Sequence, residues 1–282
     1  MTVERITDTH CHIIDRTVLD YPWLSDAPAL DRDWSIETYT QEARQAGITR
    51  TLHMEVDVAT DQIDNETDYI AGLADRQESL ICGIIAACRP ENNDFGDQIA
   101  AAQAHPLVKG FRRPLHVVPD ALSEQPLFRD NIRQLATAGL PFDICVTARQ
   151  LPQAQRLVDA APQTQFILDH CGVPDIAGAG WNSWAAEITA LSQRDNLSVK
   201  ISGLPAYAQA GWTARDLERW VMHVVEQFTP ARCVWGGDWP VCTLGGSLTD
   251  WVSATRSILA KLSTQERAAI LDENATHIWG LT

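Results

Sequence analysis

The chain has 282 residues, 45% of them hydrophobic and 21% charged, and its 37 acidic and 22 basic side chains give a formal net charge of −15. This length suits one α/β barrel, and a chain of this size buries enough surface to fold without disulfides or structural metals. So acidic a surface repels nucleic acid and anionic lipid, and no apolar stretch reaches the length of a membrane span. We therefore expect neither nucleic-acid nor membrane partners.

The seven cysteines are scattered without any C-x-x-C spacing. Several lie in apolar runs, where a free thiol behaves as a small hydrophobic group. Their odd number and the lack of a signal-like N-terminus favour a reducing, cytoplasmic location.

Short apolar runs alternate with amphipathic stretches along nearly the whole chain. Eight strands are predicted, over residues 6–14, 49–56, 80–86, 108–111, 141–146, 165–170, 197–201 and 233–236. The helices predicted between them include residues 35–46, 61–76, 125–138, 150–160, 181–194 and 213–228. Strand–helix alternation predicts parallel strands with right-handed crossovers, and eight repeats favour a closed (β/α)8 TIM barrel over an open sheet. We predict one α/β domain over residues 1–282.

Local signals support the ends of several helices. Ser35 is a typical N-cap residue at the start of the first predicted helix. Ser263 and Glu266 have the spacing of a capping box, which predicts a C-terminal helix over residues 264–279 that packs on the barrel. The least regular stretch, residues 15–34, directly follows the first strand, on the face where barrel enzymes carry their active sites.

Polar residues mark the ends of three predicted strands. His10 and His12 share one face of the first strand together with Asp8, because side chains alternate. His170 ends the sixth strand, and Asp238 follows two glycines at the end of the eighth. Taken singly, the two histidines could be two residues apart by chance, and Asp238 could be a turn residue or a helix N-cap. Together, these groups could surround one point and bind a borderline ion such as zinc, with a position left for water.

Two arginines and two tryptophans are candidates for substrate binding. Arg112 and Arg113 follow the fourth predicted strand, and alternation sends only one of them toward the barrel axis. An arginine there could hold a carboxylate or sugar hydroxyls, or could pair with a neighbouring acid. Trp23 and Trp239 are candidate walls of a pocket, or ordinary core residues.

Glu55, at the end of the second predicted strand, is a candidate for binding substrate hydroxyls. Alternation places His53 and Asp57 on the same face. The remaining histidines fall in loop-like sequence or within helices and are predicted not to be catalytic: His105, His116, His223 and His277.

The chain resembles the amidohydrolase superfamily, in the branch often called amidohydrolase-2, which includes sugar-lactone and aromatic-lactone hydrolases. Within this branch it resembles L-fucono- and L-rhamnono-lactonases. The matching segments occur in the expected order: DTHCH (8–12), YPWL (21–24), KGFRR (109–113), DHCGVP (169–174), KISGL (200–204), GGDWP (236–240) and NATHIWGL (274–281). One departure is that residues 142–146, in the fifth strand, contain no histidine where many members place a metal ligand. A site with two metals is therefore not expected.

The resemblance implies roles for four residues. His10 and His12 would be the metal pair of the first strand, and His170 would bind the metal or orient the substrate carbonyl. Asp238 would bind the metal and take the proton of the attacking water. One divalent ion, with zinc as the expected metal, is implied. Some members work without metal, and His10 and His12 would then be hydrogen-bond donors.

The expected reaction is hydrolysis of a carboxylic ester, namely a sugar (aldonic acid) lactone of carbohydrate catabolism. The alternatives on the same barrel are a dicarboxylate-lactone hydrolase, a lactone isomerase, a decarboxylase, and a barrel that binds a sugar acid without catalysis. A dicarboxylate needs two or more cationic side chains in the cavity, because each buried carboxylate needs a partner. With three lysines in the chain, we favour the sugar lactone. The expected partner is a small-molecule substrate, and homo-oligomerisation stays open.

Overall fold

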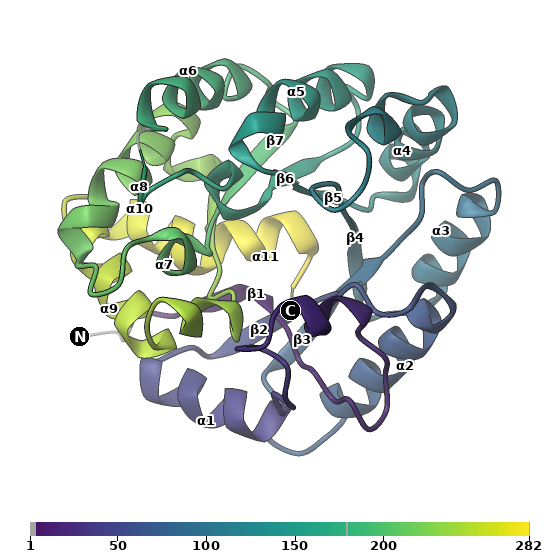
Figure 1. Cartoon of the computed structure of the whole chain (residues 1–282), viewed down its shortest axis with the longest axis horizontal. Coiled ribbons are helices and arrows are strands. Elements are labelled where there is room, and N and C mark those ends of the chain that lie inside the picture. Colours follow the sequence, from purple (N-terminus) through teal and green to yellow (C-terminus); the bar gives the residue numbers. More distant parts are fainter. Residues whose placement is uncertain (1–3, 179, 282) are drawn as a thin grey trace.

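The computed structural model describes residues 4–178 and 180–281. Eight parallel strands pair in sequential order, and the helices form a ring around them (Figure 1). The strands are β1 (Thr7–Cys11), β2 (Arg50–Met54), β3 (Ile81–Ala87), β4 (Val108–Pro114), β5 (Phe142–Cys145), β6 (Phe166–Leu168), β7 (Leu197–Ile201) and β8 (Cys233–Trp235). The predicted TIM barrel is confirmed.

The barrel closes where the segments that follow β1 and β8 meet. The backbone N–H of His12 donates to the carbonyl of Trp239, and the N–H of Asp238 donates to the carbonyl of His10, both at 2.7 Å. These two hydrogen bonds place His10, His12 and Asp238 side by side. Closure of the barrel therefore assembles part of the candidate site.

The helices are α1 (Ile36–Ala46), α2 (Ile63–Ala74), α3 (Phe95–Ala104), α4 (Pro126–Ala138), α5 (Leu151–Ala160), α6 (Trp181–Leu191), α7 (Leu204–Tyr207), α8 (Ala214–Phe228), α9 (Leu248–Leu259), α10 (Thr264–Ala268) and α11 (Asn274–Trp279). Ser35 caps α1, and the capping box of Ser263 and Glu266 is present at the start of α10. The C-terminal helix predicted as one element contains a π-helical turn, Ala269–Glu273, between α10 and α11. Among the described residues, no helix is both long enough and apolar enough to cross a bilayer.

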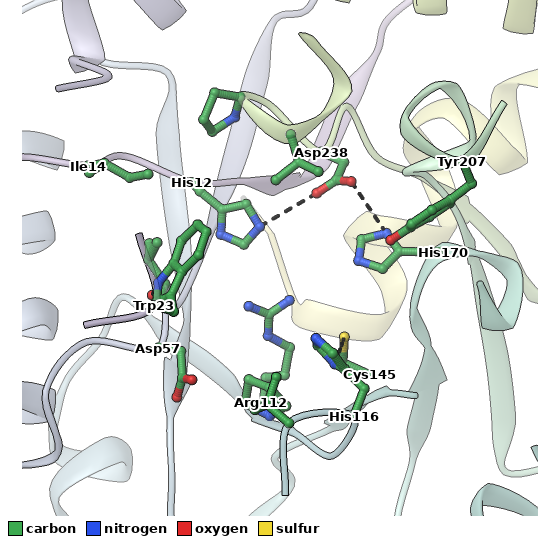
Figure 2. Close-up of a pocket in the computed structure, with 15 residues that line it drawn as sticks. His12, Ile14, Trp23, Asp57, Arg112, His116, Cys145, His170, Tyr207 and Asp238 are labelled. Atoms are coloured by element: carbon green, nitrogen blue, oxygen red, sulfur yellow. Dashed lines mark hydrogen bonds and ion pairs between the residues drawn. The ribbon is translucent and has the colours of Figure 1, made fainter. Parts of the chain in front are cut away.

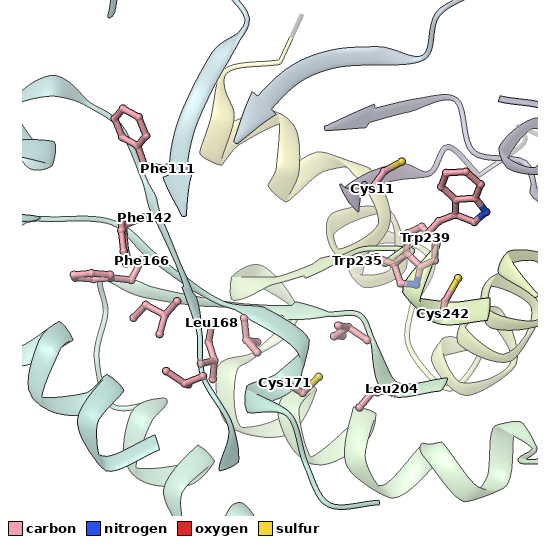
Figure 3. Packing of buried hydrophobic residues seen from close by; sticks show 14 of the residues in the cluster. Cys11, Phe111, Phe142, Phe166, Leu168, Cys171, Leu204, Trp235, Trp239 and Cys242 are labelled. Carbon is pink, nitrogen blue, oxygen red and sulfur yellow. The ribbon is translucent and has the colours of Figure 1, made fainter. Parts of the chain in front are cut away.

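Two hydrophobic clusters stabilise the barrel. The larger lies between the strands and the helices and includes Phe111, Phe142 and Phe166 on adjacent strands (Figure 3). The smaller lies inside the barrel and consists of Leu52, Met54, Ile85, Ile167, Val234, Ala275, Trp279 and Leu281. Its last three members belong to α11 and the residues just after it, and α11 crosses the middle of the ring in Figure 1.

Hydrogen bonds fix α11 at the N-terminal end of the strands. Asp272, in the π-helical turn, accepts hydrogen bonds from the side chains of Thr7 and Arg50, the first residues of β1 and β2. The C-terminal helix therefore closes this end of the barrel, and the opposite end is available for a cavity.

The first, fourth and sixth strands differ from their predicted forms. In β1 the pairing register shifts between Asp8 and Cys11, and the carboxylate of Asp8 accepts hydrogen bonds from Tyr39 Oη of α1 and from the N–H of Gly237, both at 2.7 Å. The prediction that Asp8 shares the face of the two histidines was wrong, because this irregularity breaks the alternation. Strand β6 ends at Leu168, before the predicted end, and β4 extends to Pro114, beyond it.

Candidate active site

A cavity of about 220 Å³ lies at the C-terminal end of the strands (Figure 2). Segments that follow or end seven of the eight strands contribute to its walls, which is where barrel enzymes carry their sites. The polar lining consists of His12, Asp57, Arg112, His116, His170, Tyr207 and Asp238. The remaining lining is Ile14, Trp23, Val56, Pro114, Val117, Cys145, Pro240 and Val241.

The structure brings together the four residues proposed to bind a metal. Nε2 of His10 lies 3.2 Å from Nε2 of His12, and Oδ1 of Asp238 lies 3.7 Å and 3.5 Å from these two atoms. The other carboxylate oxygen of Asp238 lies 3.8 Å from Nδ1 of His170. Figure 2 shows Asp238 between His12 and His170, and His10 is fully buried.

His10 can carry its proton on either ring nitrogen. Its Nδ1 lies 3.4 Å from the acceptor Oδ1 of Asp169 and 3.2 Å from the donor Nζ of Lys200. Nδ1 of His12 lies 3.0 Å from the carbonyl oxygen of Met54, so its N–H donates there and its Nε2 has a free lone pair. With the His10 proton on Nε2, His10 donates to His12, and both rings are satisfied without a metal.

With the His10 proton on Nδ1, its Nε2 can accept a hydrogen bond from Nη1 of Arg112 at 3.2 Å or, together with Nε2 of His12 at 3.2 Å, bind a cation. Two ligand atoms about 2.0–2.1 Å from one tetrahedral ion are roughly 3.3 Å apart. The ligand atoms of His10, His170 and Asp238 also lie within 4.8 Å of one another. The donor set therefore fits one divalent ion, although it is also satisfied without one.

A buried ion-pair network of Lys200, Asp143 and Asp169 contacts Nδ1 of His10. Nζ of Lys200 lies 2.5 Å from Asp143 and 3.0 Å from Asp169, and all three side chains are fully buried. Burial raises the pKa of Asp143 to about 7 although Lys200 opposes the shift. Burial also acts to raise the pKa of Asp169, but Lys200 and His10 outweigh it and hold that pKa well below its ordinary value. The network thus keeps an ionised carboxylate beside His10.

Burial also controls the protonation of the residues at the cavity. It lowers the pKa of His12 to about 3, with the positive charge of Arg112 acting in the same direction. Burial raises the pKa of Asp238 to about 6, against the opposing effect of His170 and Arg112. At neutral pH the cavity therefore presents a neutral imidazole and an ionised carboxylate whose pKa is close enough to neutrality for proton transfer.

Three non-glycine residues of the cavity have left-handed backbone conformations. They are Asp57, His170 and Asp238, with φ of 47°, 53° and 57°. Such strain is concentrated at functional sites, where it aims side chains that a regular strand would not. Gly203 leaves room beside two of them, because a Cβ there would lie 2.7 Å from Nδ1 of His170 and 3.0 Å from Oδ2 of Asp238.

Of the two candidate arginines, only Arg112 lines the cavity. Its Nε donates to Oε1 of Glu55 at 2.5 Å, its Nη2 donates to the Glu55 carbonyl at 2.7 Å, and its Nη1 lies 3.2 Å from Nε2 of His10. Arg113 instead pairs with Glu91 at 2.9 Å. Glu55 is fully buried and does not line the cavity.

The two candidate tryptophans lie in different places. Trp23 lines the cavity, and its indole N–H donates to the carbonyl of Val56 at 2.8 Å. Trp239 is fully buried in the hydrophobic core, where its ring packs on Trp34 and Tyr39 at centroid distances of 5.3 Å and 5.4 Å.

Four lining residues with titratable side chains were not among the site candidates: Asp57, His116, Cys145 and Tyr207. His116 was assigned to the non-catalytic histidines, yet it lies in the cavity wall with Nδ1 at 3.4 Å from Sγ of Cys145. All four lie at or after the C-terminal end of a strand, so the criterion of strand ends could have found them. Their polarity alone did not distinguish them from other loop residues.

Comparison with known proteins places this barrel in a family. The model of the amidohydrolase family matches residues 7–281. An L-fucono-1,5-lactonase from Burkholderia ambifaria is 26% identical over 278 residues, which cover 96% of this chain and 94% of that protein. A 4-sulfomuconolactone hydrolase from Rhizobium radiobacter is 25% identical over 240 residues, covering 83% of this chain and 75% of that protein.

The fold has close counterparts among solved structures. The crystal structure of an amidohydrolase from Burkholderia multivorans with bound zinc aligns with a TM-score of 0.90 and 23% sequence identity, covering 98% of this chain and 99% of that one. The match to the family model extends over nearly the entire barrel and includes every strand and each residue of the histidine–aspartate cluster. The chain therefore belongs to the amidohydrolase family.

Proposed function

We propose that this protein hydrolyses a sugar (aldonic acid) lactone, a carboxylic ester of carbohydrate catabolism. The observation that carries the proposal is the convergence of His10, His12, His170 and Asp238 at a cavity in which Asp238 has a pKa of about 6. A carboxylate of this kind can take a proton from water and release it again near neutral pH.

In the proposed reaction, Asp238 takes the proton of the attacking water and returns it to the ring oxygen as the ester opens. His170, whose Nδ1 lies 2.9 Å from Oγ of Ser202, is held in a fixed orientation to position the carbonyl oxygen. A divalent ion, with zinc the expected one, would be held by His10, His12, His170 and Asp238 and would polarise the carbonyl and lower the pKa of water from 15.7 to about 7.

The substrate-binding roles are proposed from the cavity wall. Arg112 would donate to a substrate oxygen, and Trp23 would pack against the apolar face of the ring. Glu55 would contribute by holding Arg112. Arg113 would balance charge beside the cavity, and Trp239 would support the segment that carries Asp238. The seven cysteines are all free thiols, which suits the proposed cytoplasmic location.

The relatives support a lactone as substrate, and the cavity favours a neutral lactone over an acidic one. The lactonase and the sulfomuconolactone hydrolase named above both carry lactone in their names. The second also indicates an acidic substrate, so an acidic lactone is the alternative. Among the described residues, Arg112 is the only arginine or lysine in the cavity wall, and it is already bonded to Glu55. A dicarboxylate would need more cationic partners than this.

A pH-indicator assay with a panel of lactones tests the proposal. We expect kcat/KM to be at least about tenfold higher for a sugar lactone such as L-fucono-1,5-lactone than for muconolactone, which carries a carboxylate. A preference for muconolactone would favour the alternative, and no lactone hydrolysis would contradict the proposal. Elemental analysis and a chelator test the metal: full activity of metal-free protein would refute the metal role and leave the hydrolase proposal intact.

A further inference from the structure

We infer that Asp57 binds the hydroxyl groups of the substrate ring and excludes lactones that carry an acidic group. This inference rests on the proposed lactonase function and adds a residue that determines specificity. It assigns to Asp57 the role that the sequence suggested for Glu55.

Of the two carboxylates, Asp57 reaches the cavity and Glu55 does not. Asp57 follows the C-terminal end of β2, lines the cavity, and has a side chain 28% exposed (Figure 2). Glu55 is two residues earlier and would share its face in a regular strand, but it is 0% exposed. The φ of 47° at Asp57 ends the regular alternation and directs its carboxylate differently.

A hydrogen bond to the Glu55 carboxylate holds the backbone of Asp57 in place. Oε2 of Glu55 accepts the backbone N–H of Asp57 at 2.8 Å, while Oε1 of the same side chain accepts from Arg112. One buried carboxylate therefore fixes Asp57 relative to Arg112. A strained backbone persists only where its surroundings determine it, and Glu55 supplies that restraint.

The two carboxylate oxygens of Asp57 have different surroundings. Nη2 of Arg89 and Nη1 of Arg113 approach Oδ1, at 3.5 Å and 3.8 Å. Oδ2 accepts no hydrogen bond from any residue in the described part of the chain. The charge of the carboxylate is thus balanced on one side, and the other oxygen is left to accept hydrogen bonds from a ligand.

The cavity wall around Asp57 determines which kind of ligand it suits. A carboxylate accepts hydrogen bonds from hydroxyl groups and repels a second carboxylate or a sulfonate. Beside it, Trp23 and Val56 form an apolar surface held together by the hydrogen bond from the indole to the Val56 carbonyl. Such a wall suits a ring with a C–H face and a hydroxyl edge.

The experiment compares L-fucono-1,5-lactone with δ-valerolactone, a six-membered lactone without hydroxyls. Asp57→Asn removes the charge with a residue that tolerates positive φ, and Asp57→Gly removes the side chain without backbone strain. We expect kcat/KM for L-fucono-1,5-lactone, divided by kcat/KM for δ-valerolactone, to fall about tenfold in Asp57→Asn and about 10- to 100-fold in Asp57→Gly. In both variants kcat/KM for muconolactone should rise about fivefold, because a like charge is removed.

Glu91→Gln is the matched control, because Glu91 pairs with Arg113 but does not line the cavity. Its substrate ratio should stay within about twofold of the wild type. An equal change in Glu91→Gln and Asp57→Asn, or a loss on both lactones with an unchanged ratio, would overturn the inference. Hydrolysis of a sugar lactone by the wild type, with an unchanged substrate ratio in both Asp57 variants, would overturn the inference alone, whereas a wild type without activity on any sugar lactone would overturn the proposed function with it.

Discussion

The two ends of the barrel bury different kinds of groups. At the N-terminal end, α11 inserts Ala275 and Trp279 into an apolar cluster with inward-facing strand residues. At the C-terminal end, buried histidines, carboxylates and an arginine surround a cavity, and three non-glycine residues that line it have positive φ. The ion-pair layer of Lys200 separates the two, with Nζ 5.7 Å from the centre of the Trp279 ring. The difference suits a division in which one end stabilises the fold and the other carries the proposed chemistry.

The largest expected effect is at the C-terminal end. Asp238→Asn keeps the shape of the side chain and removes the base, so kcat should fall by about 10²–10⁴-fold. The melting temperature should change little, because the variant loses no packing. Turnover close to that of the wild type would show that another group is the base.

A change at the opposite end should give the reverse pattern. Trp279→Ala should lower the free energy of unfolding by about 3–5 kcal/mol, measured by chemical denaturation, because it leaves a cavity in the apolar cluster. The kcat of the folded protein should stay within about tenfold of the wild type, in contrast to the loss expected for Asp238→Asn. If Trp279→Ala kept the stability of the wild type but lost activity, the two ends of the barrel would not have the separate roles described above.

Gly203 tests whether room beside the catalytic cluster matters more than backbone strain. Gly203→Ala should lower kcat about tenfold, because its Cβ would lie 2.7 Å from His170. Gly211→Ala is the control, since Gly211 also has a positive φ, 78° against 71°, but a Cβ there meets nothing within 4 Å. Backbone strain should cost both variants about 1 kcal/mol of stability, the close contact with His170 should add to the loss in Gly203→Ala, and only Gly203→Ala should lose activity. Equal kcat losses would assign the effect to strain alone.

The smallest expected effect is the pH dependence. Only ionised Asp238 can accept a proton, and burial raises its pKa from 3.8 to about 6. Without added metal, kcat/KM should therefore fall about tenfold per pH unit below pH 6. Added Zn²⁺ favours the carboxylate and should move this midpoint lower. A midpoint near 4 without metal would mean that Asp238 is not the group that titrates.

Much of the fold could be predicted because its signals are local. Apolar runs and amphipathic periodicity depend on neighbours in sequence, and they identified all eight strands. The end of β6 could not be located, because His170 and Cys171 adopt a left-handed turn with φ of 53° that only tertiary contacts determine. The shift at Asp8 is of the same kind, since Tyr39 and Gly237 hold it there.

The candidate site was predictable where residues occur at strand ends in recognisable motifs, as for His10, His12, His170 and Asp238. The network of Lys200, Asp143 and Asp169 was not predicted, because its ion pairs join β5, β7 and the turn after β6, which only the folded barrel brings together. Asp57 was passed over for Glu55, because the backbone turn that separates them does not show in the side-chain pattern.

Turnover in H₂¹⁸O tests the central claim, water attack on a lactone at the cavity of Asp238, most directly. The protein should convert its preferred sugar lactone into an aldonate with one ¹⁸O in the carboxylate, at a rate proportional to enzyme concentration. Asp238→Asn should form the same product about 10²–10⁴-fold more slowly. An isomerised lactone without label, release of CO₂, or equal rates for the two proteins would contradict the account.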